Sequence, residues 1–208
     1  MSVLPLVFTS GWASGVNAYA VVLLLGLLGS AGITDEVPES MQRPEVLITA
    51  GILFLFEGVV DKVPYLDSLW DTISTLIRPA VGSGVAALLA GQSGSMEELS
   101  AGAVGGTTAL ASHVVKTGTR MAINASPEPV SNFLMSTAED LGVGTLVTLA
   151  VFYPVAAAVI AGLLLLIGFV LLILLATRIR RFRRRRRERR QQRALDGRIG
   201  SRPWHRLR

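Results

Sequence analysis

The chain has 208 residues, of which 50% are hydrophobic, and its mean hydropathy is +0.51. It contains no cysteine and two histidines, which excludes disulfides, thiolate nucleophiles and the usual zinc-binding spacings. The net charge of +5 combines a basic tail, where residues 178–208 carry 15 Arg and two acids, with residues 1–177, which carry a net charge of −8. This composition is typical of a membrane protein.

Apolar stretches follow one another along the chain at 3–29, 44–60, 79–92, 101–118, 131–152 and 155–176. The last of them is long enough for a helix to cross the hydrocarbon, which requires roughly 20 residues at about 1.5 Å per residue. We therefore predict an all-α polytopic membrane protein with six transmembrane segments in residues 1–177. The stretch 79–92 is short, so it is either re-entrant or part of a helix that starts near Leu69 and carries Arg78 into the membrane.

The first and fourth stretches share a pattern of small residues, "SGWASGVNAYA" at 10–20 and "AGAVGGTTALA" at 101–111. Each contains a GxxxG spacing, which allows membrane helices to approach closely. Six crossings would make these stretches run in opposite directions, as in the inverted 3+3 repeats of secondary transporters, here 1–92 and 101–177. The alternative is that two helices rich in small residues resemble each other by chance.

Carboxylates cluster in "LFLFEGVVDKVPYLDSLWD", residues 53–71. Glu57 lies inside an apolar run, where a charge costs at least about 2.5 kcal/mol on insertion scales, so we expect it to face a partner, water or a solute. Pro64 then ends the helix, and the next residues alternate at helical spacing between an apolar and a charged face. We predict an amphipathic helix along the cytoplasmic interface, with Asp67 and Asp71 on a solvated face at the inner mouth.

A second acidic site, "AEDLGV", places Glu139 and Asp140 inside a predicted crossing, pointing about 100° apart. His113, Lys116 and Arg120 follow one helical face and are the expected partners of these acids. Such a network is either architectural or part of an ion pathway. The predicted ion or substrate pathway comprises Asn17, Glu57, Asp61, Lys116, Arg120, Glu139 and Asp140. The predicted inner-mouth charge network comprises Lys62, Asp67, Asp71, Arg78 and Glu128.

The arginine-rich tail, residues 178–208, predicts the orientation of the chain. The positive-inside rule retains "RIRRFRRRRRERR" on the cytoplasmic side of the membrane, and six crossings then place the N-terminus there as well. So many like charges favour a tail that is disordered or lies on the membrane, and the absence of interleaved aromatic residues argues against specific nucleic-acid binding. We expect anionic lipid headgroups to bind Arg183, Arg184, Arg185, Arg186 and Arg187.

The stretches "SGWASGVNAYAVVLLLGLLG", "FEGVVDKVPYLDSLWDTISTLIRP", "GGTTALASHVVKTGTRMAINASPEPVSN" and "AEDLGV" together resemble a bacterial family, the domain of unknown function 4126. The matching residues extend from 10 to about 145, and both the acid and the proline patterns take part in the match. The resemblance implies an integral membrane protein and supplies no reaction.

These features favour a small secondary transporter or channel-like protein for a cation or a small polar solute. The alternative is a non-transporting membrane scaffold, in which the buried charges are static and the basic tail recruits lipids or proteins. No nucleophile–base pair, Walker loop, GxGxxG or GxSxG motif is present, so we expect neither an enzyme nor a bound cofactor, and the residues do not decide whether a metal binds. The GxxxG at Gly11 and Gly15 suits either an internal contact or a homo-oligomer.

Overall fold

The computed structural model describes residues 3–63, 66–91, 95–123 and 129–200. Each element found in these ranges is a helix: α1 (Leu4–Ser30), α2 (Glu39–Gln42), α3 (Pro44–Val60), α4 (Leu66–Ala90), α5 (Ser95–Ile123), α6 (Pro129–Phe152) and α7 (Pro154–Gly200). Helices long and apolar enough to cross a membrane are found at Leu4–Ser30, Leu66–Ala90, Phe133–Phe152 and Pro154–Phe182. The prediction of an all-α membrane protein is confirmed, whereas six crossings are not.

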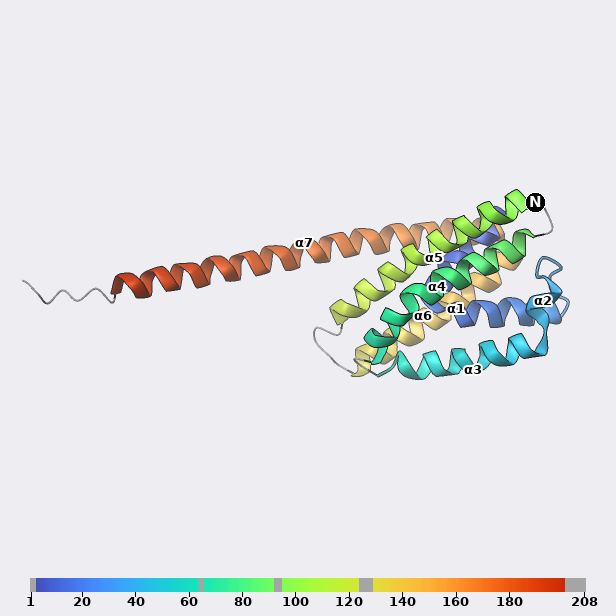
Figure 1. Cartoon of the computed structure of the whole chain (residues 1–208), viewed down its shortest axis with the longest axis horizontal. Helices are drawn as coiled ribbons and strands as arrows, with labels where there is room; N and C mark the ends of the chain where they lie inside the picture. Colours follow the sequence, from blue (N-terminus) through green and yellow to red (C-terminus); the bar gives the residue numbers. More distant parts are fainter. Residues whose placement is uncertain (1–2, 64–65, 92–94, 124–128, 201–208) are drawn as a thin grey trace, which may run out of the picture. The chain divides into compact units, whose positions relative to one another are not determined.

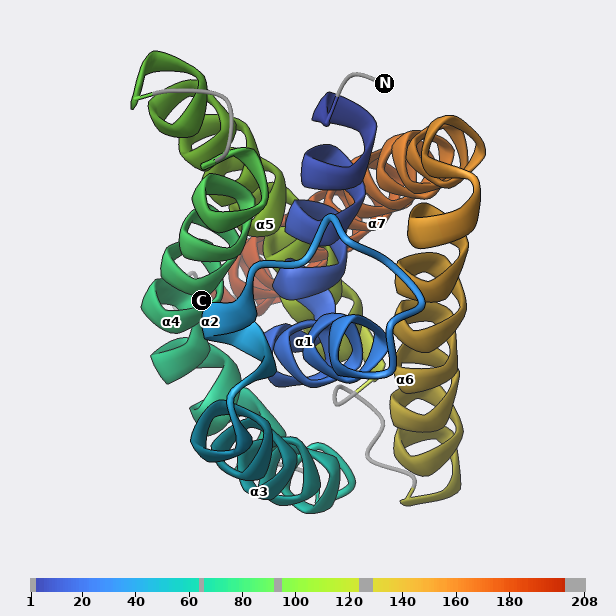
Figure 2. The same cartoon turned by 90° about the vertical axis from the view of Figure 1, so that its right-hand side faces the viewer.

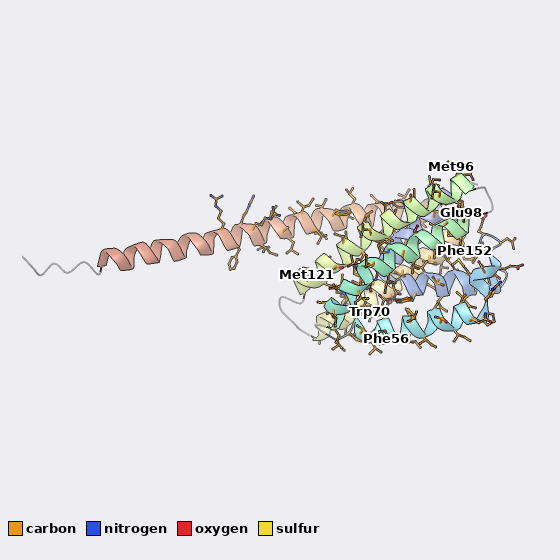
Figure 3. All side chains as sticks on the ribbon, viewed as in Figure 1. Phe56, Trp70, Met96, Glu98, Met121 and Phe152 are labelled. Atoms are coloured by element: carbon orange, nitrogen blue, oxygen red, sulfur yellow. The ribbon has the colours of Figure 1, made fainter. Side chains whose placement is uncertain are left out.

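The chain divides into two compact units, residues 1–169 and residues 170–208. In the first unit, α1 lies between α4 and α5 on one side and α6 on the other (Figure 2). The two ends of this bundle carry different residues: Met96, Glu98 and Phe152 lie at the end where α2 is found, and Phe56, Trp70 and Met121 lie at the opposite end (Figure 3). We call the first of these the α2 end. We call the second the network end, after the buried ion-pair network described below.

Helix α1 turns back on itself at Asn17, whose φ of −150° and ψ of 98° are not helical. Before the break, Trp12 and Val16 lie beside Ser112 and Lys116, so the first half runs in the same direction as α5. After the break, the second half runs antiparallel to α3 and returns to the α2 end, where the first half began (Figure 1). The two halves of α1 therefore enter and leave the bundle at one end, which differs from the single crossing that the sequence predicts.

Small residues bring α1, α4 and α5 into close contact. A Cβ atom added to Gly11 would lie 2.7 Å from the backbone oxygen of Gly105, and one added to Gly82 would lie 2.6 Å from the Cβ of Ala109. The GxxxG of α1 is thus used inside the chain, against α5. Because the first half of α1 and α5 are parallel, the two similar small-residue stretches are not related by inversion, and this corrects the predicted inverted repeat.

Helix α4 is amphipathic with its polar face turned inward. Asp67, Asp71, Ser74 and Arg78 are each 1% exposed, whereas Leu76, on the other face, is 81% exposed. This corrects the prediction of an amphipathic helix lying along the cytoplasmic interface with solvated acids. In a membrane the solvent around a bundle is apolar, so an amphipathic helix stabilises the protein by turning its polar side to the interior. The 25-residue helix carries Arg78 inward, as the alternative starting near Leu69 anticipates.

The boundary between the last two helices lies where the sequence predicts it: α6 ends at Phe152 and α7 begins at Pro154. Helix α7 continues to Gly200, so the predicted disordered tail is helical up to that residue. A helix already nucleated in its apolar part extends at little cost, and arginine has a high helix propensity.

Candidate functional site

The break in α1 creates two helix ends inside the bundle. The amide of Ala20 donates to Asn17 Oδ1 at 3.0 Å, so Asn17 is the N-cap of the second half. Its amide group also donates to Asp140 Oδ1 at 3.0 Å, which ties the break to α6. Non-helical backbone at membrane depth requires such partners because lipid offers none.

Two buried cations bind the carbonyl groups that the break releases. Lys116 Nζ donates to the carbonyl of Val16 at 2.9 Å, and Arg78 Nη1 donates to that of Gly15 at 3.3 Å. Positive charge is favourable at the C-terminal end of a helix, here the end of the first half of α1. These cations therefore stabilise the turned-back conformation of α1.

Arg78 also forms the first part of a buried ion-pair network. Its Nη2 lies 2.5 Å from Glu57 Oε1 and 3.3 Å from Asp71 Oδ1. Its Nη1 lies 2.9 Å from His113 Nδ1, so that nitrogen accepts a hydrogen bond and the imidazole is neutral. The proton is then on Nε2, which donates to the carbonyl of Asp71 at 3.1 Å. Helices α3, α4 and α5 are joined through this one guanidinium.

Lys116 and Arg120, both on α5, form the second part of the network. Lys116 Nζ lies 2.7 Å from Asp61 Oδ2, 3.5 Å from Glu139 Oε2 and 3.9 Å from Glu57 Oε1. Arg120 Nη2 lies 2.5 Å from Glu139 Oε2 and 3.4 Å from Asp61 Oδ2. Asp67 completes this part, with Oδ2 at 3.7 Å from Arg120 Nη1.

The network holds more negative than positive groups. Among the described residues it contains the five carboxylates of Glu57, Asp61, Asp67, Asp71 and Glu139 but three cations, Arg78, Lys116 and Arg120, so full ionisation leaves two excess negative charges. Glu57 is 1% exposed, and its Oε2 has no hydrogen-bond partner in the described part of the chain. Buried charge of this kind requires compensation, either by a bound cation or by protons.

Asp61 lies in the α3–α4 connection, directly after the last residue of α3. Burial in itself raises the pKa of its carboxyl group, but the Lys116 ammonium and the Arg120 guanidinium outweigh this effect. They hold the pKa below its ordinary value, so Asp61 is a fixed negative charge at neutral pH.

A cavity of about 350 Å³ opens beside the network between α1, α5, α6 and α7. Lys116 and Glu139 are the charged residues of its wall, and the rest is apolar or weakly polar. Gly142 of α6 also lines the cavity, and a Cβ added there would meet no atom within 4 Å. The network is therefore accessible to a molecule of modest size on the side of Glu139.

The structure brings together all seven residues of the predicted pathway. Glu139 and Asp140 face different partners, as their 100° separation requires: Arg120 for the first and Asn17 for the second. From the predicted inner-mouth set, Asp67, Asp71 and Arg78 belong instead to the buried network.

The two remaining inner-mouth residues are Lys62 and Glu128. Lys62 Nζ donates to the carbonyl of Gly58 and lies 5.7 Å from the ring centre of Phe133. Glu128 lies outside the described residues, as do the side chains of Arg183 and residues 185–187, whereas Arg184 is exposed. The described residues include no group of three or more His, Asp or Glu side chains able to hold a metal ion.

The sequence did not indicate which backbone groups take part in the site. The carbonyls of Gly15 and Val16 become acceptors because α1 breaks, and residues 10–20 contain no proline. The available signal was Asn17, an N-cap residue type directly before an apolar helical run.

Comparison with known proteins gives the family of the chain. No curated protein and no solved structure matches it. A family model described as domain of unknown function (DUF4126) matches residues 4–173, which include the whole network and both halves of α1. The chain therefore belongs to the family of the domain of unknown function DUF4126.

Proposed function

We propose that this protein is a small secondary transporter or channel-like protein that moves a cation or a small polar solute together with protons. The observation that carries the proposal is the buried network of five carboxylates and three cations beside the broken helix α1. Its excess negative charge attracts a proton or a cation, and each cation contacts more than one carboxylate. Exchange of partners as a positive charge enters or leaves is the expected mechanism.

Flux through proteoliposomes tests this proposal directly. The wild-type protein is reconstituted with a pH-sensitive dye or with dyes for divalent cations, beside Glu57→Gln, Glu139→Gln and the control Glu97→Gln. Glu97 is an exposed acid near the start of α5, at the α2 end. We expect flux in the wild type and the control and its loss in the two network variants, all of them folded. Folded wild-type protein that moves none of these ions would exclude their transport and favour the scaffold or another solute, and network variants that retain full flux would contradict the proposal.

The orientation follows from the chain path and the positive-inside rule. In the first unit, Gly162 lies beside Phe8 and Gly168 beside Val115, so residues 154–169 of α7 run towards the network end, and in the sequence the arginines follow from Arg178. We propose that the network end is cytoplasmic in an inner membrane and that the arginines after Arg178 bind anionic lipid. Because α1 turns back, the α2 end and Leu4 are then outside, unlike the cytoplasmic N-terminus that six crossings require.

Labelling of single cysteines tests the orientation, since the chain has no native cysteine. An impermeant thiol reagent added to intact cells should label Leu4→Cys and Thr34→Cys but not Lys62→Cys. Labelling of Leu4→Cys only after permeabilisation would restore the topology with six crossings.

A static scaffold is the second candidate function. Its support is that the three network cations also bind the backbone, at Gly15, Val16 and Asp61, so they stabilise the fold whatever else they do. A scaffold predicts that neutralising Glu57 destabilises the protein as much as breaking any other buried ion pair, because the change leaves a buried cation unpaired. The loss in free energy of unfolding on Glu57→Gln therefore separates the two candidates.

A further inference from the structure

The cavity beside Glu139 has the composition of a binding site for an organic cation. Its wall joins Trp12 of α1, Met135 of α6 and Leu164 of α7 to two charged groups, Lys116 and Glu139. Its volume of about 350 Å³ lies at the lower end of the usual range for small-molecule sites, about 300 to 1,000 Å³. A ligand with an apolar body and one polar head therefore fits the lining.

The sign of the head group follows from the network behind the cavity. Lys116 is compensated within 3.9 Å by Asp61, Glu139 and Glu57, and among the described residues the five carboxylates of the network exceed its three cations by two charges. Glu139 is the network acid on the cavity wall, and its side chain is 10% exposed. An anion would add to the excess, whereas a cation would compensate it. Trp12 on the same wall adds a ring suited to a cation.

We propose that this cavity binds a monovalent organic cation of amine or quaternary-ammonium type, with an apolar substituent against Met135 and Leu164. The inference rests on the proposed function and names its substrate class. Protons that compensate the network in the empty state leave when the cation enters, so binding releases protons.

Two glycines of α6 provide a matched pair for the test. Gly142 lines the cavity and Gly144 does not, and a Cβ added to either would meet no atom within 4 Å. Gly142→Leu therefore fills part of the cavity, while Gly144→Leu makes the same change on the same helix outside it.

Calorimetry of the detergent-purified protein measures the binding of benzyltrimethylammonium and of the anion phenylmethanesulfonate, in two buffers with different ionisation enthalpies. We expect the cation to bind at least about tenfold more tightly than the anion and to release protons. Gly142→Leu should weaken cation binding at least about tenfold, and Gly144→Leu should leave it unchanged.

Three results would overturn the inference. They are wild-type protein that is folded but binds no cation, equal binding of cation and anion, and binding that survives Gly142→Leu. A co-purified phospholipid that is lost in Gly142→Leu, in protein that binds no cation, would assign the cavity to lipid instead. Ion flux in proteoliposomes separates this inference from the proposed function: flux without cation binding overturns the inference alone, and cation binding without flux overturns the transporter alone.

Discussion

Neutralising a base of the network should destabilise the protein much more than neutralising an acid. The pair to compare is Lys116→Gln and Glu57→Gln, since both side chains are buried, at 4% and 1% exposure, and they lie within 3.9 Å of each other. Removing Lys116 raises the excess of negative charge from two to three, whereas removing the charge of Glu57 lowers it from two to one. In a static and balanced network, Glu57→Gln would instead cost as much as breaking any other buried ion pair, about 3 to 5 kcal/mol.

The distances to Lys116 give the size of the effect. Its three contacts, at 2.7, 3.5 and 3.9 Å, each contribute about 4 to 6 kcal/mol of attraction at an effective dielectric constant of about 20. Desolvation of the ammonium offsets several kcal/mol per ion, and breaking a buried pair by removing one partner costs about 3 to 5 kcal/mol in total. We expect this cost for Lys116→Gln.

Glu57→Gln should cost less. The amide oxygen still accepts from Arg78, which keeps Asp71 as its ionic partner, and the repulsion between Glu57 and the neighbouring acids disappears. We expect a loss of at most about 2 kcal/mol, the usual value of a hydrogen bond to a charged group.

Reversible unfolding in mixed micelles, followed by circular dichroism, measures both losses in free energy. Glu97→Gln is the control for an exposed acid and should change the free energy of unfolding by less than about 0.5 kcal/mol. Equal losses for Lys116→Gln and Glu57→Gln would refute the role of excess negative charge and favour the scaffold. A loss below about 1 kcal/mol for Lys116→Gln would refute the ion-pair account itself.

Three further predictions concern the elements around the network. Gly82→Ala should cost about 1 to 3 kcal/mol in unfolding free energy, because its Cβ would lie 2.6 Å from that of Ala109, whereas Gly84→Ala on the same helix has open space and should be neutral or stabilising. Asn17→Ala should cost about 1 to 2 kcal/mol through loss of the N-cap and of the bond to Asp140, and an unchanged melting temperature would contradict the capping role. Because the folded pKa of Asp61 is lowered, its contribution to stability is present above its ordinary value of 3.8 and is lost as the pH falls through the folded value, so Asp61→Asn should reduce the acid-induced fall in melting temperature.

The members of the site could be predicted from the sequence because a charged residue in an apolar segment is costly to bury and therefore needs a partner. Glu57 and Glu139 inside apolar segments predict partners among the bases on one face of α5. The structure pairs Glu57 with Lys116 and Glu139 with Arg120. The proline at 154 likewise predicts the boundary between α6 and α7 without tertiary information.

The orientation of α4 was predicted wrongly because the periodicity of a helix does not tell which solvent surrounds it. Asp67, Asp71 and Arg78 share one face, and this pattern suits an interfacial helix in contact with water as well as a membrane helix with a polar interior. The buried residues after Pro79 decide between these: Gly82, Val85 and Leu89 continue the same face as small and apolar groups. A face that is charged at one end and apolar at the other suits the interior of a bundle.

The broken helix α1 and the ion network depend on each other. Neither the hydropathy nor the charge pattern of the sequence predicts this dependence. The break at Asn17 needs donors for the carbonyls of Gly15 and Val16, and Arg78 and Lys116 are those donors. The same cations need carboxylates to be buried at all, and α3, α4 and α6 supply them. A proton or cation that weakens the hold of the acids on Arg78 or Lys116 therefore also changes the support of the α1 break, so the charge state of the network is coupled to the conformation of the helix at the centre of the bundle.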